Sequence, residues 1–63
     1  SHIAYIAKKN AKEVLRSKVD VQLSPMTPDE RRVVHNILNG WEHIKTESTG
    51  EGNDRAVVIK YVE

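Results

Sequence analysis

The segment Thr-Pro-Asp-Glu at residues 27–30 fixes the start of a helix, and this constrains the fold more than any other feature of the chain. The threonine can cap the helix, the proline suits the first helical position, and the glutamate can return a hydrogen bond to the cap residue. The two carboxylates also favour the positive end of the helix dipole. This capping box predicts a helix over residues 28–39, which Gly40 ends in a left-handed conformation.

Four other segments have a clear periodicity. Apolar residues at helical spacing predict a helix over residues 3–18, with basic side chains on its exposed side. Alternation of apolar and polar residues predicts a strand over residues 19–24, buried on one face from Val19 onward. Residues 43–48 also alternate, and residues 55–62 are the most apolar strand. The turn-forming residues between these last two strands predict an antiparallel hairpin.

These elements predict an α+β fold, a small two-layer domain in the order helix-strand-helix-strand-strand. The last strand is apolar on both faces, so we expect it in the middle of a three-stranded mixed sheet, antiparallel to both neighbours. A right-handed crossover would leave the two outer strands parallel, with both helices on one face. Sixty-three residues can hold only one core, so residues 1–63 are expected to form a single domain. Residues 1–2, Ser-His, resemble the remnant of a cleaved tag.

Several classes of protein are disfavoured by composition. The chain has no cysteine, and His2, His35 and His43 lack the spacing of metal ligands, so no metal or other cofactor is expected. The carboxylates fall in caps, loops and exposed strand positions, without the constellation that an enzyme needs. No apolar run reaches the length of a membrane span, so no membrane partner is expected. The lack of cysteine suits a reducing cytoplasm.

The net charge of +1 is unevenly distributed. Residues 1–18 hold five basic side chains and one acidic one, a net of +4, whereas residues 19–63 hold five basic and eight acidic ones, a net of −3. A basic first helix is either an electrostatic footprint for an anion or an ordinary solvated helix face. Composition does not choose between the two.

Arg31 and His35 are four residues apart on the capped helix and are therefore neighbours on its surface. A permanent cation beside an imidazole, close to a helix start, can bind a phosphate, and the flat ring can stack on a base. The structural alternative is that Arg31 pairs with Glu30 or another acid, while His35 lies at the rim of the core and bonds to a backbone carbonyl.

Three segments together resemble a known family. They are Leu-x-Pro-Met-x-Pro-x-Glu-Arg-Arg-x-x-His at residues 23–35, Ser-x-Gly-Glu-x-x-x-Arg at residues 48–55, and Val-Val-Ile at residues 57–59. The pattern resembles the R-three-H domain, and in particular its branch in the bacterial Jag, or SpoIIIJ-associated, protein family. The resemblance implies a mixed α/β domain that binds single-stranded nucleic acid, with Arg31 and His35 as contact residues.

The resemblance also implies a bacterial, cytoplasmic, RNA-associated protein in which a KH domain directly precedes this one. No Gly-x-x-Gly loop of a KH domain occurs in the chain, so we expect it to correspond to the C-terminal domain of a longer protein. Affinity for RNA would then depend partly on the KH domain.

We therefore expect non-catalytic binding of single-stranded RNA, or of DNA. Arg31 and Arg32 would contact phosphates, and His35 a phosphate or a base. The cationic surface would be extended by Arg55, Lys45 and Lys60. The modest net charge leaves two alternatives open, a protein-interaction module that docks a partner or a neighbouring domain, and a purely structural cap on the KH domain.

Overall fold

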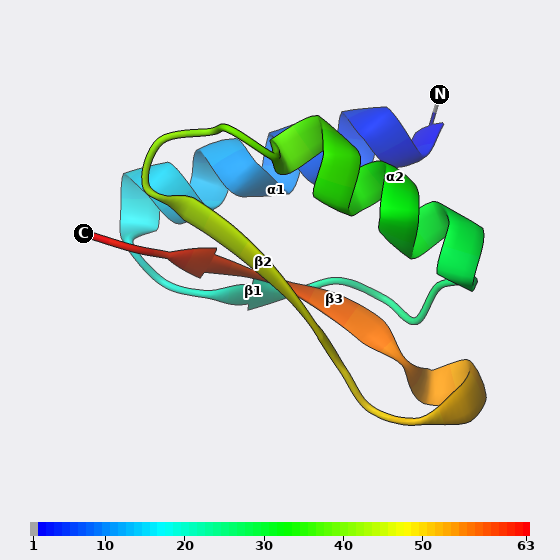
Figure 1. The fold of residues 1–63 in the computed structure, drawn as a ribbon. Helices are drawn as coiled ribbons and strands as arrows, with labels where there is room; N and C mark the ends of the chain where they lie inside the picture. The colour runs from blue at the N-terminus through cyan, green and yellow to red at the C-terminus, as the bar shows by residue number, and fades with distance from the viewer. Residues whose placement is uncertain (1) are drawn as a thin grey trace.

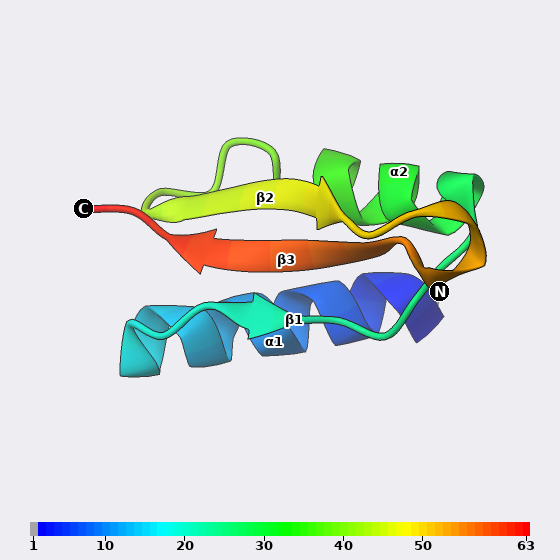
Figure 2. The ribbon, with the colours of Figure 1, turned by 90° about the horizontal axis from the view of Figure 1, so that it is seen from below.

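The computed structural model describes residues 2–63, and Ser1 of the proposed tag remnant lies outside them. The elements are α1 (His2–Ser17), β1 (Val21–Gln22), α2 (Pro28–Leu38), β2 (Ile44–Thr49), the 3-10 turn η1 (Gly52–Asp54) and β3 (Ala56–Tyr61). Both helices lie on one side of the sheet (Figure 1), and the opposite face of the sheet is uncovered (Figure 2). The predicted order of elements and the α+β class are confirmed.

The sheet has the order β1-β3-β2, and β3 is antiparallel to both neighbours. Ile59 of β3 lies opposite Val21 of β1 on one side and opposite Thr46 of β2 on the other. The predicted central position and direction of β3 are confirmed. The two outer strands do not pair with each other, so the hydrogen-bonded ladders are antiparallel rather than mixed.

The core lies between the helices and the central strand. Its fully buried members on the strand are Val57 and Ile59, and α1 contributes Ala7, Ala11 and Val14. From α2 come Val34 and Leu38, and Leu23 closes the core from the segment after β1. Burial of each valine, leucine or isoleucine stabilises the fold by about 1.5–3 kcal/mol before entropy is counted. These contacts fix α2 against β2 and β3, and so fix the side chains that α2 carries.

β1 is shorter than the predicted strand of residues 19–24. Val19 is 62% exposed, so its predicted burial was wrong. The side chain of Asp20, rather than its backbone, accepts a hydrogen bond from the Tyr61 amide at 3.0 Å. Leu23 N still donates to Val57 O at 2.9 Å beyond the assigned strand. The chain therefore runs beside β3 over the predicted region but forms a regular ladder only at its centre.

The two faces of β2 differ in character. Ile44, Thr46 and Ser48 are half-buried, whereas the residues between them are exposed. Since alternate side chains of a strand point to opposite faces, β2 turns two small hydroxyls toward the helices and its charged side chains toward the uncovered face.

Candidate functional site

The start of α2 is built by the predicted capping box. The hydroxyl of Thr27 accepts a hydrogen bond from Glu30 N at 3.3 Å, and the Glu30 carboxylate accepts one from Thr27 N at 3.0 Å. Pro28 occupies the first turn. These bonds satisfy backbone donors that would otherwise be unpaired. They set the direction in which the next turn presents its arginines.

Arg31 ties α2 to the segment before it. Its Nη1 donates to Met26 O at 2.6 Å, and Met26 N donates to Arg55 O at 3.2 Å. The side chain of Arg31 and the backbone of Arg55 therefore both bond to Met26, although these arginines are far apart in sequence. A hollow of about 260 Å³ lies beside Arg31, between the residues that precede α2 and Asn53 of η1. A guanidinium has five N–H groups, so most of those of Arg31 remain for a ligand.

Arg32 and Arg55 are exposed and weakly held. Arg32 Nη1 lies 3.8 Å from the carboxylate of Asp29, and both side chains are largely solvated. Such a surface pair contributes little to stability. Arg55 Nη1 donates to Gly50 O at 3.0 Å in the hairpin loop. Both guanidinium groups can turn toward a ligand at small cost.

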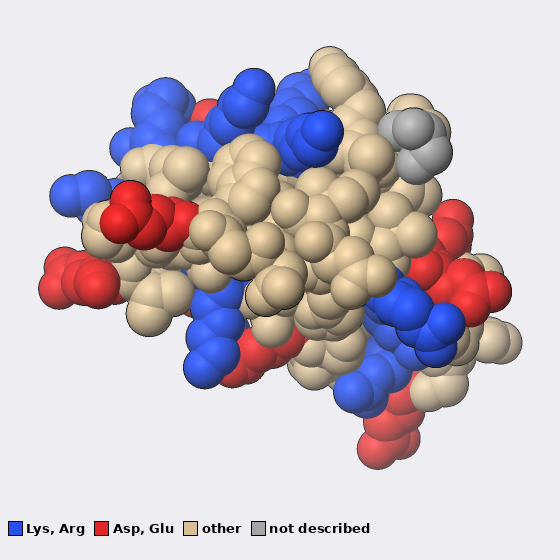
Figure 3. All heavy atoms as spheres, turned by 45° about the horizontal axis from the view of Figure 1, so that its top comes forward, with Lys and Arg blue, Asp and Glu red and all other residues tan. Residues whose placement is uncertain are grey.

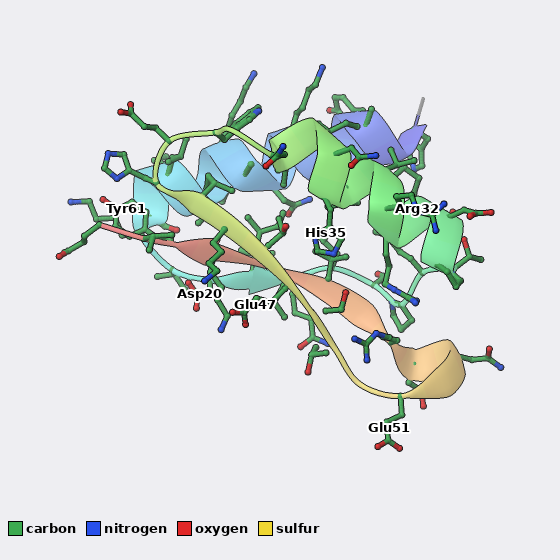
Figure 4. The ribbon with its side chains drawn as sticks, viewed as in Figure 1. Asp20, Arg32, His35, Glu47, Glu51 and Tyr61 are labelled. Atoms are coloured by element: carbon green, nitrogen blue, oxygen red, sulfur yellow. The ribbon has the colours of Figure 1, made fainter. Side chains whose placement is uncertain are left out.

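His35 lies between α2 and β2, where it points toward the sheet (Figure 4). Its Nδ1 is 2.5 Å from Thr46 Oγ1, and its Nε2 is 3.3 Å from Ser48 Oγ. A hydroxyl can donate or accept, so each ring nitrogen has a suitable hydrogen-bond partner within the fold. The alternative of a backbone carbonyl as the partner of His35 was wrong, because both partners are side-chain hydroxyls.

Thr46 and Ser48 were missing from the candidate residues. Their signal in the sequence is the alternation of β2, which places two small hydroxyls on the inward face where apolar residues are usual. Finding their partner required the position of α2 against β2, which the sequence pattern does not give.

Lys45 and Lys60 lie on the sheet face that the helices leave uncovered, directly opposite each other on neighbouring strands. Lys60 Nζ is 2.9 Å from a carboxylate oxygen of Glu47, which points to the same face (Figure 4). The hydrogen bond and the charge of Lys60 lower the pKa of Glu47, and those of Glu47 raise the pKa of Lys60. Part of the positive charge on this face is therefore neutralised.

The six candidate residues thus lie in three places. Arg31 and Arg55 both lie beside Met26, with Arg32 next to Arg31 on α2. Lys45 and Lys60 lie on the outer sheet face, and His35 lies between α2 and β2. The space-filling view shows lysine and arginine side chains over α1 and a separate group at the lower right beside acidic residues (Figure 3). On the face shown in Figure 3, the basic side chains do not form one continuous surface.

The described part of the chain contains no arrangement typical of a metal centre. Among residues 2–63, no group of three or more histidine or carboxylate side chains could hold a metal ion. His43 instead bonds to Val62 O at 2.9 Å and stacks on the ring of Tyr61. Neither helix within residues 2–63 is long and apolar enough to cross a bilayer.

Comparison with known proteins agrees with the motif. The family model of the R-three-H domain matches residues 1–61. Two similar curated proteins are both named RNA-binding protein KhpB. The one from Bacillus subtilis (strain 168) is 41% identical over 61 residues, and the one from Clostridium symbiosum is 43% identical over 54 residues. The alignments cover 94% and 86% of this chain but only 29% and 24% of those proteins. Because the family model spans nearly the whole chain, this protein belongs to the R-three-H domain family.

Proposed function

We propose that this domain binds single-stranded nucleic acid, most favourably RNA, and catalyses no reaction. The observation that carries the proposal is that Arg31 and Arg55 both lie beside Met26, in front of α2, while Arg32 follows Arg31 on the helix, and that each guanidinium has donors that the fold does not use. Guanidinium groups match phosphate oxygens through paired hydrogen bonds. The two relatives named RNA-binding protein KhpB support RNA as the ligand.

The three arginines would contact the phosphate backbone. The helix dipole favours an anion at the start of α2. The capping box already occupies the amides of Thr27 and Glu30, however, and the carboxylates of Asp29 and Glu30 oppose an anion there. Few phosphates can therefore be held at once, and the affinity of this domain alone should be weak. With three or four phosphate contacts, the slope of log K against log salt should be about −2 to −3 for a single strand.

The other candidate residues have secondary roles in this proposal. Lys45 and Lys60 would extend the cationic surface on the outer sheet face, with Lys60 weakened as a phosphate ligand by Glu47. Both ring nitrogens of His35 have hydroxyl partners within the fold. His35 would therefore stack its ring face on a base, or it would replace its hydrogen bond to one hydroxyl with a hydrogen bond to a phosphate.

The domain would act as part of a longer protein. This chain spans less than a third of the length of the two curated relatives. We place it at the C-terminus of a cytoplasmic bacterial protein, directly after a KH domain that binds the same strand. Two linked contacts of modest strength on one strand give a combined affinity well above either alone.

A second candidate function is docking onto a protein partner or the neighbouring domain. It is favoured by the modest net charge of +1, and the internal bonds of Arg31 and His35 give both motif residues a structural role that needs no nucleic acid. The salt dependence of the binding affinity distinguishes the two functions. Phosphate contacts weaken steeply as salt rises, whereas an interface with an apolar centre responds little.

A matched pair of arginine variants tests the proposal. Arg32 and Arg16 are both 73% exposed in their side chains, and each pairs with an acid three residues before it on its helix. Arg32→Ala should weaken binding to a single-stranded RNA of about ten nucleotides and reduce the salt slope by roughly one phosphate contact. Arg16→Ala serves as the control on α1. Fluorescence anisotropy across a salt series would measure both.

Amide NMR shifts in the same titration would locate the contact. We expect them around residues 27–36 and 55–60. No shifts with a folded protein, or a salt slope near zero, would contradict the phosphate-contact model and favour the docking function.

A further inference from the structure

A second hollow, distinct from the one beside Arg31, lies between the C-terminal half of α2 and the open edge of β2. Its volume is about 420 Å³, within the usual range of about 300–1,000 Å³ for small-molecule sites. The residues that matter for its chemistry are Asn36, Leu38, Asn39, Ile44, Lys45 and Thr46. His35 also lines it, so the hollow adjoins the motif residues without including the three arginines.

Two apolar side chains lie at the bottom of this hollow, but most of its accessible lining is polar. Leu38 is only 2% exposed and Ile44 is half-buried, so both side chains are held by the core rather than free to move. A base in the hollow would therefore gain a small apolar contact at the bottom and would depend mainly on polar contacts with the lining.

The rim of the hollow carries two side-chain amides. Asn36 and Asn39 are three residues apart on and just after α2, and both are exposed. Within residues 2–63, neither side chain forms a hydrogen bond to another part of the protein. Each amide offers a donor and an acceptor side by side, the pair that reads the edge of a nucleobase.

The backbone of β2 adds further polar groups beside the hollow. His43 O accepts a hydrogen bond from Val62 N at 2.9 Å. Hydrogen-bonded and non-hydrogen-bonded residue pairs alternate along an antiparallel ladder. Because His43 and Val62 are a hydrogen-bonded pair, Lys45 and Lys60, two residues further on, are also one, and Thr46 and Ile59 are not. The backbone N–H and C=O of Thr46 therefore point away from β3, toward the open edge of the sheet. This edge is not covered by another strand.

Building on the proposed function, we propose that this hollow is a subsite for one unpaired nucleobase of the bound strand, with adenine as the best match. Adenine presents an adjacent donor and acceptor on two edges, N6 with N1 and N6 with N7, so a side-chain amide can pair with it in two orientations. The base would contact the exposed part of Ile44 at the bottom of the hollow, and Asn36 or Asn39 would read its edge.

The test compares four oligouridines of equal length, three of which carry a single adenine, cytosine or guanine at the central position. Affinities would be measured by anisotropy for the unaltered chain, for Asn36→Ala, for Asn39→Ala, and for Gln22→Ala. Gln22 is an exposed side-chain amide on β1, away from the hollow, and is the matched control. The side-chain NH2 signals of Asn36 and Asn39 would be followed by NMR in the same samples.

We expect the adenine-containing strand to bind on the order of tenfold more tightly than the all-uridine strand, the discrimination of one good bidentate contact. One or both asparagine variants should remove this preference and leave the salt slope unchanged, while Gln22→Ala should keep it. The NH2 signals of the contacting asparagine should shift with the adenine strand.

Equal affinity for all four strands, or a preference that survives both asparagine substitutions, would overturn the inference. If binding remained salt-dependent in that case, the proposed function would stand without a base subsite. Absence of any binding by the folded chain would overturn the inference and the proposed function together.

Discussion

His35 and Thr46 join α2 to β2 through a contact of 2.5 Å between Nδ1 and Oγ1. Ser48 takes the other ring nitrogen at 3.3 Å. The histidine of the family motif therefore also links the helical layer to the sheet through hydrogen bonds. If substitution of His35 abolished binding, the cause could be a lost contact with the ligand or a destabilised fold. The stability of the variant must therefore be measured together with its affinity.

The His35–Thr46 bond should have a measurable effect on stability. Thr46→Val keeps the side-chain shape but removes the hydroxyl, which leaves one ring nitrogen without its partner. We expect the free energy of unfolding to fall by about 1 kcal/mol. His35→Ala should lower it by about 2 kcal/mol, because both hydrogen bonds and the packing of the ring are lost. Urea unfolding followed by circular dichroism measures both values.

Thr49→Val is the control for this prediction. Thr49 lies on the same strand but is exposed on the opposite face, and surface changes of this kind usually alter stability by less than about 0.5 kcal/mol. If Thr49→Val were as costly as Thr46→Val, the bond to His35 would not be the source of the loss.

Arg31 should stabilise the segment before α2. Arg31→Ala removes the bond to Met26 O, and we expect a loss of about 1 kcal/mol in the free energy of unfolding. The amide of Met26, which bonds to Arg55 O, should exchange with solvent faster in the variant. Hydrogen-exchange NMR measures this locally. Arg32→Ala should leave both quantities nearly unchanged, since its ion pair with Asp29 is long and exposed. Equal effects of the two variants would contradict a structural role for Arg31.

Much of the fold follows from local sequence signals. The start of α2 could be predicted because a capping box depends only on residues within one turn. The central position of β3 could be predicted because Val57 and Ile59 face the helices while Ala56 and Val58 keep the other face apolar. Each of these signals is contained within a few neighbouring residues.

The parts that were missed depend on contacts between distant segments. The length of the β1 ladder is set by how the chain leaves α1, where Lys18 adopts a positive φ of 60° and Val19 remains exposed. The partners of His35 lie on another element, at positions 46 and 48, and could be found only from the packing of α2 on β2. The hollow between these elements is likewise a product of packing.

The pair of Glu47 and Lys60 should be visible in a pH titration. Lys60 lowers the pKa of Glu47 below its ordinary value of 4.5. The charged pair therefore stabilises the folded state above that value, and the contribution is lost as the pH falls through the pKa of Glu47 in the folded chain. Lys60→Gln should raise the pKa of Glu47. NMR detection of the side-chain carboxyl signal measures it directly.

Lys45→Gln is the comparison for this titration. Lys45 also lowers the pKa of Glu47, but through its charge alone and as a smaller cause. The upward shift in the Lys45 variant should therefore be smaller than that in the Lys60 variant. A larger shift for Lys45→Gln would mean that the contact at 2.9 Å is not the dominant interaction.

Gly40 and Gly50 have nearly the same φ, so a comparison of their alanine variants distinguishes backbone strain from steric conflict. Gly40 has φ 92° and Gly50 has φ 90°. A side-chain Cβ at Gly40 would meet no atom within 4 Å, whereas one at Gly50 would lie 2.8 Å from Asp54 O. Gly40→Ala should cost about 1–2 kcal/mol of stability from the left-handed backbone alone. Gly50→Ala should cost more, because the hairpin loop must also move.

The loop movement in Gly50→Ala has a local consequence. Arg55 Nη1 bonds to Gly50 O, so a displaced loop should free Arg55 and alter the arginine group at the start of β3. We expect amide shifts to spread from Gly50 to Arg55 and Met26 in this variant, and to remain near Gly40 in the other. Equal stabilities of the two variants, measured by thermal unfolding, would show that the loop absorbs the added methyl group without moving the arginine.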